Sequence, residues 1–381
     1  MAPSCGATRV GGVRVSAQRA PSVLRKGRVG RVVRGDSLTA GPVRASGDAV
    51  PAVSSEGDKS LPASGVGAGT NWAPKKFEDI VQAASEALRA ALEDGETRVE
   101  VEFPPFGDGE AGYKEASDSY IDANMQIAIA MARLVSRKRS VHIVVPDSGE
   151  LNRTLGMFGS ALDTMPELSI GSLSEANLGV DALFQKVTGL FDPQRERKAE
   201  LLAKQRSAED SDLVLVVNCS AVELPYIREA VEGGKWGKDK PVVLVNLELD
   251  TLRADLGLPS FPPKALHYEF LSTFKPVFYI RARDYSKTLP KAPFQFNYSG
   301  AVFRKYPGPW ECLLREDAGN YRSVAQSEDR YPLGQMKEEL LNALGLAERE
   351  GSAMEFLTRG YTNTTWWEQD IDKEKSGRWR T

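Results

Sequence analysis

The chain has 381 residues, 41% of them hydrophobic, with 49 Lys and Arg against 52 Asp and Glu and a formal net charge of −3. Residues 1–46 hold eight arginines, Lys26 and a single acid, Asp36, so a charge of +8 there leaves −11 for the rest of the chain. A body this acidic repels phosphate backbones, which argues against nucleic-acid binding. Three cysteines and two histidines at unsuitable spacings predict neither a disulfide scaffold nor a metal site.

Residues 1–46 are typical of an organellar transit peptide, because they are rich in Arg, Ala and Ser and poor in acids. The alternative is a basic arm that binds nucleic acid. The small residues of Val43–Ser46 suit a processing site. Residues 47–71, rich in Gly, Ser, Ala and Pro, predict a flexible linker. We expect residues 72–381 to form a single α/β domain.

The first half of this domain alternates predicted helices with strands. Apolar residues recur at helical spacing from Phe77 to Leu92, and a strand is predicted at Arg98–Phe103. Ser119 and Asp122 fit a capping box that opens a largely apolar helix reaching about Ser136. Val141–Val145 is an unbroken apolar strand. The longest apolar stretch, Ile127–Val135, is too short to span a bilayer and contains Arg133, so we predict no transmembrane segment.

The alternation continues with a helix near residues 149–162, a stretch without a clear pattern, and a helix around Glu223–Val231. Apolar strands are predicted at Asp212–Val217 and Pro241–Asn246. Strands without polar alternation, separated by helices, indicate a parallel sheet covered on both faces. We therefore predict an α/β fold with a mostly parallel, Rossmann-like sheet.

After residue 270 the strands become shorter and are joined by turns such as Pro307-Gly308 and Asp317–Gly319. This pattern is typical of an antiparallel meander, which we expect to extend the same sheet. Two short helices are predicted to follow, at Gly334–Leu344 and Ser352–Thr358. The predicted strands are Val277–Ile280, Gly300–Arg304, Trp310–Leu314 and Tyr321–Ala325.

No complete catalytic motif is present. The phosphate-binding patterns G-x-G-x-x-G and G-x-x-x-x-G-K-[ST] and the nucleophile pattern G-x-S-x-G do not occur. Cys219 follows an apolar strand, but no histidine is placed to activate it, so a buried inert thiol is favoured. Gly233–Lys238 follows a helix and is interpreted as a surface loop. The charged segment Asp192–Arg206 is interpreted as a solvated helix, with a partner-binding helix as the alternative.

Polar residues follow three of the predicted apolar strands. In a parallel sheet these strand ends lie side by side, at the edge where ligands bind. Binding of an anionic metabolite or nucleotide is one interpretation, and capping of the following helices is the other. The residues are Asp147, Ser148, Asn218, Ser220 and Asn246.

The carboxyl-terminal residues are unusually aromatic, because Trp366, Trp367 and Trp379 lie among charged residues. Large aromatic side chains carry much of the binding energy at protein interfaces, which makes all three partner-binding candidates. The alternative is that they fold back onto the domain. If they form an interface, deletion of residues 366–381 should abolish partner capture and leave the fold intact.

Several stretches resemble the plant and algal plastid family called domain of unknown function 1995, over roughly residues 72–380. The resemblance implies a chloroplast protein, either stromal or peripherally associated with the thylakoid, that helps assemble photosystem II. Its implied partners are photosystem II subunits or the thylakoid insertion machinery. The resemblance implies no cofactor and no catalytic residue. The stretches are Val101–Phe106, Ser117–Asn124, Tyr306–Trp310, Lys337–Leu346, Glu355–Tyr361 and Trp366–Glu368.

Two hypotheses remain open. In the first, the chain is an assembly factor, not an enzyme, and acts through protein–protein contacts. In the second, it binds or converts a metabolite or nucleotide at the carboxyl ends of the parallel strands. A family member attached to a plastid adenylate kinase keeps the second hypothesis in view.

Overall fold

The computed structural model places most of residues 74–381, all within one compact unit, Ser64–Thr381. The predicted transit peptide, the linker, the helix at Ser352–Thr358 and all of Asp192–Arg206 except Arg206 lie outside the described residues. The structure describes residues 74, 76–104, 117–136, 139–173, 206–237, 239–316, 319–347 and 364–381.

The described strands form one nine-stranded sheet in the order β3-β2-β4-β5-β1-β6-β7-β8-β9. The six strands from β3 to β6 are parallel to their neighbours, and β7 to β9 continue the sheet in antiparallel pairing. The predicted parallel sheet with an antiparallel extension is confirmed. The strands are β1 (Arg98–Glu102), β2 (Val141–Val145), β3 (Leu168–Ser172), β4 (Leu213–Val217), β5 (Val242–Val245), β6 (Lys275–Thr288), β7 (Gln295–Lys305), β8 (Trp310–Arg315) and β9 (Tyr321–Ser327).

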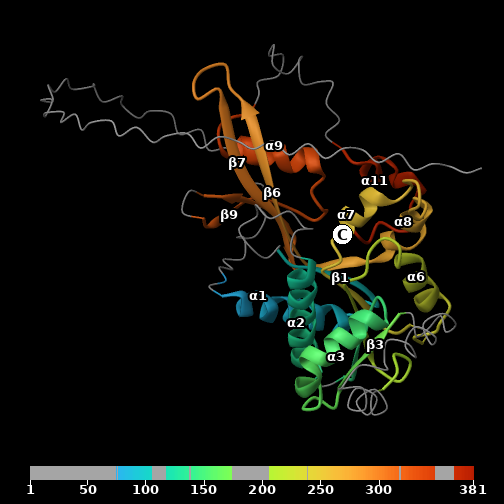
Figure 1. Cartoon of the computed structure of the whole chain (residues 1–381). Coiled ribbons are helices and arrows are strands. Elements are labelled where there is room, and N and C mark those ends of the chain that lie inside the picture. Colours follow the sequence, from blue (N-terminus) through green and yellow to red (C-terminus); the bar gives the residue numbers. More distant parts are fainter. Residues whose placement is uncertain are drawn as a thin grey trace, which may run out of the picture. The chain divides into compact units, whose positions relative to one another are not determined.

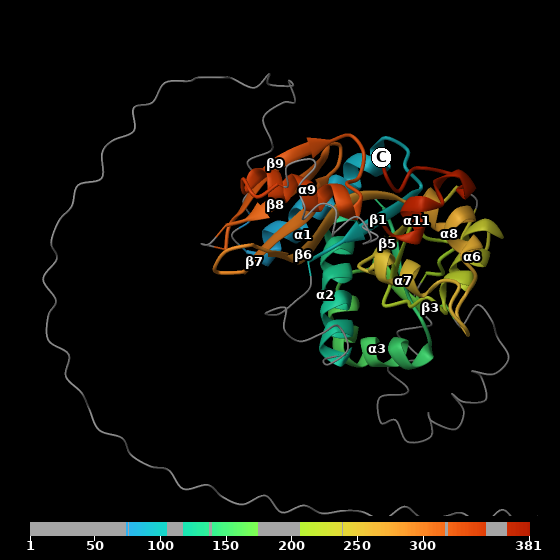
Figure 2. The same cartoon turned by 90° about the horizontal axis from the view of Figure 1, so that it is seen from above.

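Helices cover both faces of the parallel half (Figures 1 and 2). One face packs against α1, α2 and α3, and the other against α6, α7 and α8. The strand order differs from the Rossmann order in that β1 lies between β5 and β6. The helices are α1 (Phe77–Glu93), α2 (Ser117–Val135), α3 (Ser148–Leu162), α6 (Leu224–Glu232), α7 (Leu249–Asp255), α8 (Ala265–Glu269), α9 (Leu333–Ala343) and α11 (Trp366–Gln369), with 3₁₀ turns η3 (Leu271–Thr273) and η4 (Ile371–Lys373).

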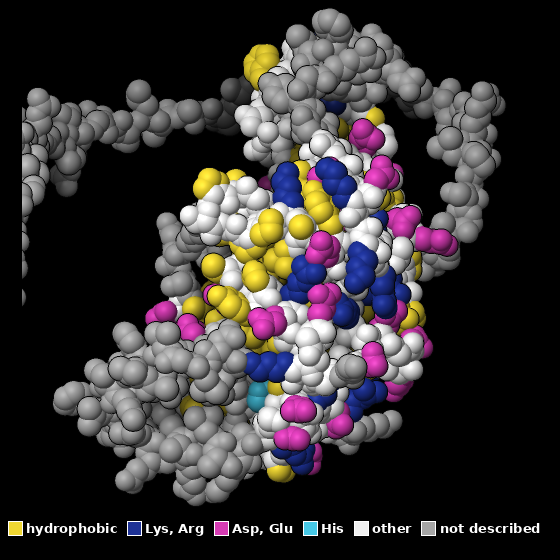
Figure 3. Space-filling model, turned by 90° about the vertical axis from the view of Figure 1, so that its right-hand side faces the viewer, with side chains coloured by type: hydrophobic (Ala, Val, Ile, Leu, Met, Phe, Trp, Pro, Cys, Tyr) yellow, Lys and Arg dark blue, Asp and Glu magenta, His cyan; other side chains and the backbone are white. Residues whose placement is uncertain are grey.

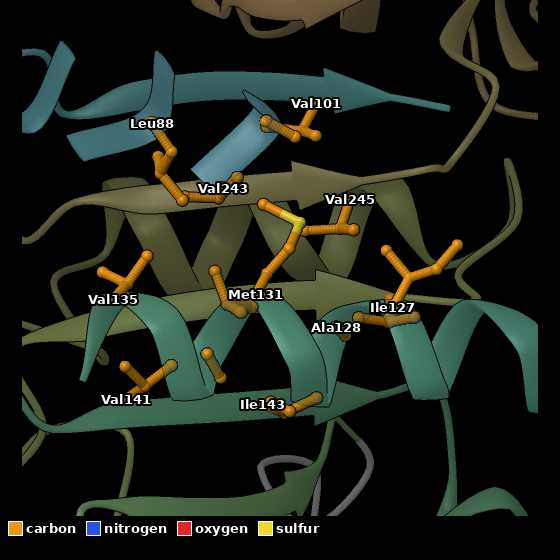
Figure 4. Packing of buried hydrophobic residues seen from close by; sticks show 14 of the residues in the cluster. Leu88, Val101, Ile127, Ala128, Met131, Val135, Val141, Ile143, Val243 and Val245 are labelled. Carbon is orange, nitrogen blue, oxygen red and sulfur yellow. The ribbon is translucent and has the colours of Figure 1, made fainter. Parts of the chain in front are cut away.

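The core of the parallel half is aliphatic. Every residue of β2, β4 and β5 is buried. In Figure 4, Met131 of α2 reaches toward Val243 and Val245 of β5, which pair in register with Val99 and Val101 of β1. Each such side chain contributes roughly 1.5–3 kcal/mol by leaving water, so this layer dominates the stability of the half.

The antiparallel half has its own core, in which α9 packs on β7 and β8. Met336 and Leu340 of α9 lie against Trp310 and Cys312 of β8. Gly300 of β7 makes this close approach possible, because a Cβ there would lie 2.7 Å from Leu340 Cδ1. The helix α9 therefore forms a second layer on the antiparallel extension of the sheet.

Several boundaries differ from the sequence expectations. The strand β3 was missed because Leu168–Ser172 contains two serines and a glycine and so lacks an apolar run. The predicted capping box at Ser119 is wrong, since α2 begins at Ser117 and Ser119 lies inside the helix. The helices α7 and α8 were not predicted, because helices of 7 and 5 residues give little periodic signal.

The strands β6 and β7 are much longer than predicted and pair from Phe278–Lys305 to Thr288–Gln295. Their distal part alternates between exposed and half-buried residues, so it lacks the apolar run that marks the proximal part. No helix in the described parts of the chain combines the length and the apolar character that crossing a membrane requires.

Candidate functional site

The polar residues at the carboxyl ends of β2 and β4 are largely used in local turns. Asp147 caps α3, because its Oδ1 accepts a hydrogen bond from Glu150 N at 2.9 Å. Ser148 is the first residue of that helix. The Ser220 hydroxyl bonds to Glu223 and accepts from Val222 N at 3.3 Å. Asp147 therefore caps the following helix, as the capping interpretation expects.

Asn218 and Asn246 are brought together by Asn124 of α2. Asn124 Nδ2 donates to Asn218 Oδ1 at 3.1 Å, and Asn246 Nδ2 donates to Asn124 Oδ1 at 2.6 Å. Phe103 N donates to Asn246 Oδ1 at 3.0 Å. Asn218 and Asn246 have φ of 60° and 51°, a left-handed conformation that Asn tolerates better than most residues. These amides are hydrogen-bonded to one another and to the backbone, and these bonds hold α2 against the strand ends.

Further polar contacts lie at the same end of α2, where Asn246 Nδ2 also donates to Tyr120 Oη at 3.4 Å. Tyr120 donates to Glu248 Oε1 at 3.0 Å, and both burial and the Glu248 carboxylate raise the Tyr120 pKa. Asp122 accepts two hydrogen bonds from Arg153, each 2.9 Å long. At this edge of the parallel sheet these polar side chains are therefore hydrogen-bonded to one another.

A different group of polar residues surrounds a cavity of about 260 Å³ in the antiparallel half. Its walls come from β6, α7, α9 and the segment Thr364–Thr381, which we call the C-terminal segment. We call this space the arginine cavity, because three arginines line it. The lining residues are Asp250, Thr251, Ala254, Tyr279, Arg281, Arg283, Val302, Arg330, Tyr331, Leu333, Met336, Thr365, Trp367, Glu368 and Trp379.

Asp250 is the centre of the charges around the arginine cavity. Its Oδ1 accepts from Arg253 Nη1 at 2.8 Å, and its Oδ2 accepts from Arg330 Nη2 at 2.8 Å and Arg283 Nη2 at 3.3 Å. Tyr279 Oη also donates to Oδ2, at 3.1 Å. Burial alone would raise the Asp250 pKa, but the surrounding arginines hold it well below its usual range. Asp250 is therefore ionised at neutral pH.

Two further carboxyl groups lie on β1, on the strand face opposite Val99 and Val101. Glu100 and Glu102 are 1% and 3% exposed. Burial raises the pKa of both, although Arg253 and Arg330 act against it for Glu100 and Arg281 acts against it for Glu102. The negative charge of these two acids offsets only part of the positive charge of the arginines, because burial favours the neutral form of each acid.

The C-terminal segment covers this charged group with aromatic rings. The Trp379 ring lies 4.8 Å from the Arg253 guanidinium and 5.3 Å from that of Arg330. Glu374 accepts from Trp379 Nε1 at 3.1 Å and from His267 Nε2 at 2.9 Å. Burial lowers the His267 pKa to about 4, so the contact with Glu374 is a hydrogen bond from a neutral imidazole.

The three tryptophans do not form an exposed aromatic surface. Trp367 and Trp379 are buried, at 8% and 3% exposure, and Trp366 is partly buried against the helical face of the parallel half. Folding of this chain therefore covers most of Trp367 and Trp379, as the alternative interpretation of the sequence expected. Trp366 is half-buried, and Lys264 Nζ lies 4.6 Å from its ring centre.

The thiols and imidazoles are in inert positions. Burial raises the pKa of Cys219 well above its usual value and that of Cys312 to about 12. Burial lowers the His142 pKa to about 4, and His142 Nδ1 lies 2.8 Å from Ser169 Oγ. Within the described ranges, no group of three or more His, Cys, Asp or Glu residues is placed to hold a metal ion.

The arginine cavity was missed by the sequence analysis, although weak signals exist. Arg281 and Arg283 lie two residues apart and therefore on the same face of a strand. Asp250 and Arg253 lie three residues apart on a helix. Arg330 comes from a loop far along the chain. No sequence spacing indicates that these three sources meet.

The layers define the class of the protein: helices on both faces of a mainly parallel sheet make it a doubly wound α/β protein, extended here by an antiparallel meander. The chain belongs to the family described as domain of unknown function (DUF1995), whose model matches residues 74–338. No curated protein and no solved structure matches the chain.

Proposed function

We propose that the chain is a chloroplast accessory factor that assists assembly of photosystem II through protein–protein contacts. The proposal starts from the sequence resemblance to the chloroplast protein named low photosystem II accumulation 3, and from the basic leader of residues 1–46. The closed polar network at the strand ends and the inert thiols support a role other than catalysis. The partner we propose is the chlorophyll-binding core subunit or the machinery that inserts it.

One surface carries the proposal. Leu258 and Phe261, in the connection between α7 and α8, are 50% and 41% exposed, and Ile371 of η4 is 45% exposed. The two segments are held together, because Lys264 lies over the Trp366 ring and Tyr268 Oη donates to Asp370 Oδ2. We call Leu258, Phe261, Ile371 and the half-buried Trp366 the apolar surface.

The apolar surface suits an aromatic-anchored interface, because apolar side chains there are bordered by charged ones. Figure 3 looks onto the side of the molecule where α6, α8 and α11 lie, and apolar atoms on it are interspersed with Lys, Arg and acidic side chains. An apolar centre with a charged rim gives affinity at the centre and selectivity at the edge.

The test is capture from detergent-solubilised thylakoids with residues 47–381 as bait. We expect the natural chain to recover a chlorophyll-binding core subunit of photosystem II, identified by mass spectrometry. The double variant Leu258→Ser, Phe261→Ser should recover several-fold less, since interface apolar anchors each carry on the order of 1–2 kcal/mol. The control is Met157→Ser, Tyr321→Ser, which alters two side chains that are 51% and 44% exposed, on α3 and on β9.

Equal recovery by both double variants, or recovery of no photosystem II or insertion-machinery subunit by the natural chain, would contradict the proposal. The leader is tested separately by fusing residues 1–71 to a fluorescent protein. We expect the fusion to enter chloroplasts, and a fusion that remains in the cytosol would show that residues 1–46 are not a transit peptide.

A further inference from the structure

We infer that the arginine cavity binds a small organic anion, in which a carboxylate or phosphate group is attached to an apolar body. The cavity uses residues other than those of the apolar surface, so this inference does not rest on the proposed function. Two observations carry it: buried arginine donors that the described residues leave without acceptors, and apolar side chains that line the same cavity.

Two of the arginines that line the cavity have a buried nitrogen without a hydrogen-bond acceptor among the described residues. Arg330 is 9% exposed, and its buried Nη1 has no hydrogen-bond partner among the described residues. The buried Arg281 Nη1 also lacks one in the same ranges, and its nearest carboxylate oxygen, Glu102 Oε1, is 3.5 Å away. A guanidinium presents five N–H donors, and a buried donor without an acceptor is costly. An oxyanion in the cavity would supply the missing acceptors.

The carboxylates that line the cavity are already in use. Asp250 accepts from Arg253, Arg283, Arg330 and Tyr279 at once. Glu368 accepts from the backbone N–H groups of Leu333 at 2.9 Å and Thr365 at 2.8 Å, and so holds α9 and α11 together. Three arginines line the cavity together with these two acids, and Glu102 of β1 lies 3.5 Å from Arg281 and offsets part of the positive charge. Guanidinium groups that line a partly water-excluded cavity favour an anion.

The remaining wall determines the rest of the ligand. Val302, Leu333, Met336 and Trp367 face the same space as the arginines. A volume of about 260 Å³ equals that of about eight or nine water molecules, so it suits an aromatic or short aliphatic ligand and not a polymer. Small-molecule sites combine apolar side chains with fixed polar groups, and the arginine cavity has both kinds, with a larger share of charged residues than usual.

Stability alone does not explain the arginine group. Replacing a buried ion network with apolar residues of similar volume is often neutral or stabilising. Here the network leaves guanidinium nitrogens unsatisfied beside an open space, whereas a purely structural network would pack the space and satisfy its donors. The geometry is that of a preformed anion site.

The binding test uses phenyl phosphate and benzoate as probes, with benzyl alcohol as the neutral analogue and inorganic phosphate as the anion without an apolar body. Isothermal titration calorimetry and thermal unfolding of residues 47–381 measure binding. We expect phenyl phosphate or benzoate to bind and to raise the Tm, benzyl alcohol not to bind, and inorganic phosphate to bind more weakly than phenyl phosphate. The inference is overturned if neither aromatic anion binds at a concentration of about 10 mM, because a Kd above that value is weaker than the affinities usual for small ligands.

Two variants locate the site. Arg283→Gln removes a lining arginine whose side chain is 30% exposed, and it should lower the affinity about tenfold or more, because one charge-assisted hydrogen bond is lost. Arg153→Gln is the matched control, since that side chain is 32% exposed, pairs with acids and lies at the parallel-strand edge. Ala254→Phe places a ring at an exposed position of the lining and should block entry without altering a charge.

The variant results separate the outcomes. Loss of binding in Arg283→Gln and Ala254→Phe, with binding retained in Arg153→Gln, supports the arginine cavity. Loss in Arg153→Gln alone places the anion at the strand edge and overturns the inference. Equal binding by all four proteins also overturns it, because the probe then binds elsewhere. Far-ultraviolet circular dichroism confirms that each variant is folded.

Discussion

The parallel and antiparallel halves of the sheet are stabilised by different chemistry. Between β3 and β5 the strands are buried on both faces by aliphatic side chains. From β1 onward the sheet contains buried Glu100, Glu102, Arg304 and Glu311, and Arg330 and Asp250 lie over it. A sheet that is buried by helices on both faces needs only apolar residues. The buried charged residues from β1 onward are therefore not required by packing alone.

The comparison also separates two kinds of polar network. At the parallel-strand edge, Asn124, Asn218 and Asn246 satisfy each other, which fixes α2 in place. Around the arginine cavity, several guanidinium nitrogens remain without partners in the described parts of the chain. A network in which every donor has an acceptor holds the structural elements together, whereas one with unpaired donors beside a cavity can bind a ligand.

The largest effect is expected from deleting residues 366–381. The deletion removes the buried Trp367 and Trp379 and the Glu374 carboxylate, which is 1% exposed. Loss of a single buried Trp side chain costs about 3–5 kcal/mol, so the deletion should exceed about 5 kcal/mol and prevent cooperative folding. Urea unfolding followed by circular dichroism measures this.

This expectation replaces the earlier one that the fold would survive the deletion. The control is Ile371→Ala, at a side chain that is 45% exposed, which should change the free energy of unfolding by less than about 0.5 kcal/mol. A deleted chain with an unchanged unfolding midpoint would show that the C-terminal segment does not cover the charged group.

The next largest effect is expected from Asp250→Asn. It leaves Arg253, Arg283 and Arg330 without their shared carboxylate, and breaking a buried ion pair from one side costs about 3–5 kcal/mol. The matched control is Asp122→Asn, whose partly exposed bidentate pair with Arg153 should cost about 1 kcal/mol or less. Equal losses in urea unfolding would remove the distinction between the halves.

Histidine burial makes stability depend on pH in the parallel half. Burial lowers the His142 pKa to about 4, so between about pH 6.5 and 4 the unfolded chain takes up a proton that the folded chain does not. Stability is therefore full above pH 6.5 and decreases as the pH falls through this window, by up to about 3 kcal/mol for one such histidine.

His142→Gln should remove this contribution. Relative to the natural chain at pH 7.5, the variant should lose less stability by pH 4.5. Glu100 and Glu102, with raised pKa values, act in the opposite direction in both chains, so the difference between the two curves isolates His142. Parallel curves would mean that His142 is protonated or accessible in the folded state.

The smallest effect is expected from Ile143→Val in the aliphatic core shown in Figure 4. Removing one methyl group from a fully buried isoleucine costs about 0.5–1.5 kcal/mol. Val324→Ala on β9, where the strand is only partly buried, is the control and should cost less. A larger loss on β9 than on β2 would contradict the assignment of the main core.

The sequence predicted the parallel half well because each of its central strands is a continuous apolar run, such as Leu213–Val217. Periodicity failed where burial depends on a distant partner. Ser169 of β3 is buried because it meets His142, and the polar distal part of β6 is a strand because it pairs with β7. Such pairings are tertiary facts that no local pattern contains.

The same reason limits what the sequence showed of the candidate sites. It correctly placed Asn218 and Asn246 at one edge, since parallel strands end together, but not the Asn124 that binds them. The charged group around Asp250 combines a short helix, a long strand, a loop and the C-terminal segment. Tryptophans beside charges, which suggested an interface, instead stack on Arg253 and Arg330.

The central claim is that the parallel half is a closed framework and that ligand chemistry lies in the antiparallel half. Hydrogen–deuterium exchange with and without phenyl phosphate tests it most directly. We expect slower exchange in Leu249–Asp255, Lys275–Thr288 and Leu333–Ala343, with no change at residues 145–148, 217–220 and 245–248. Protection at those strand ends, or nowhere in the chain, would contradict the claim.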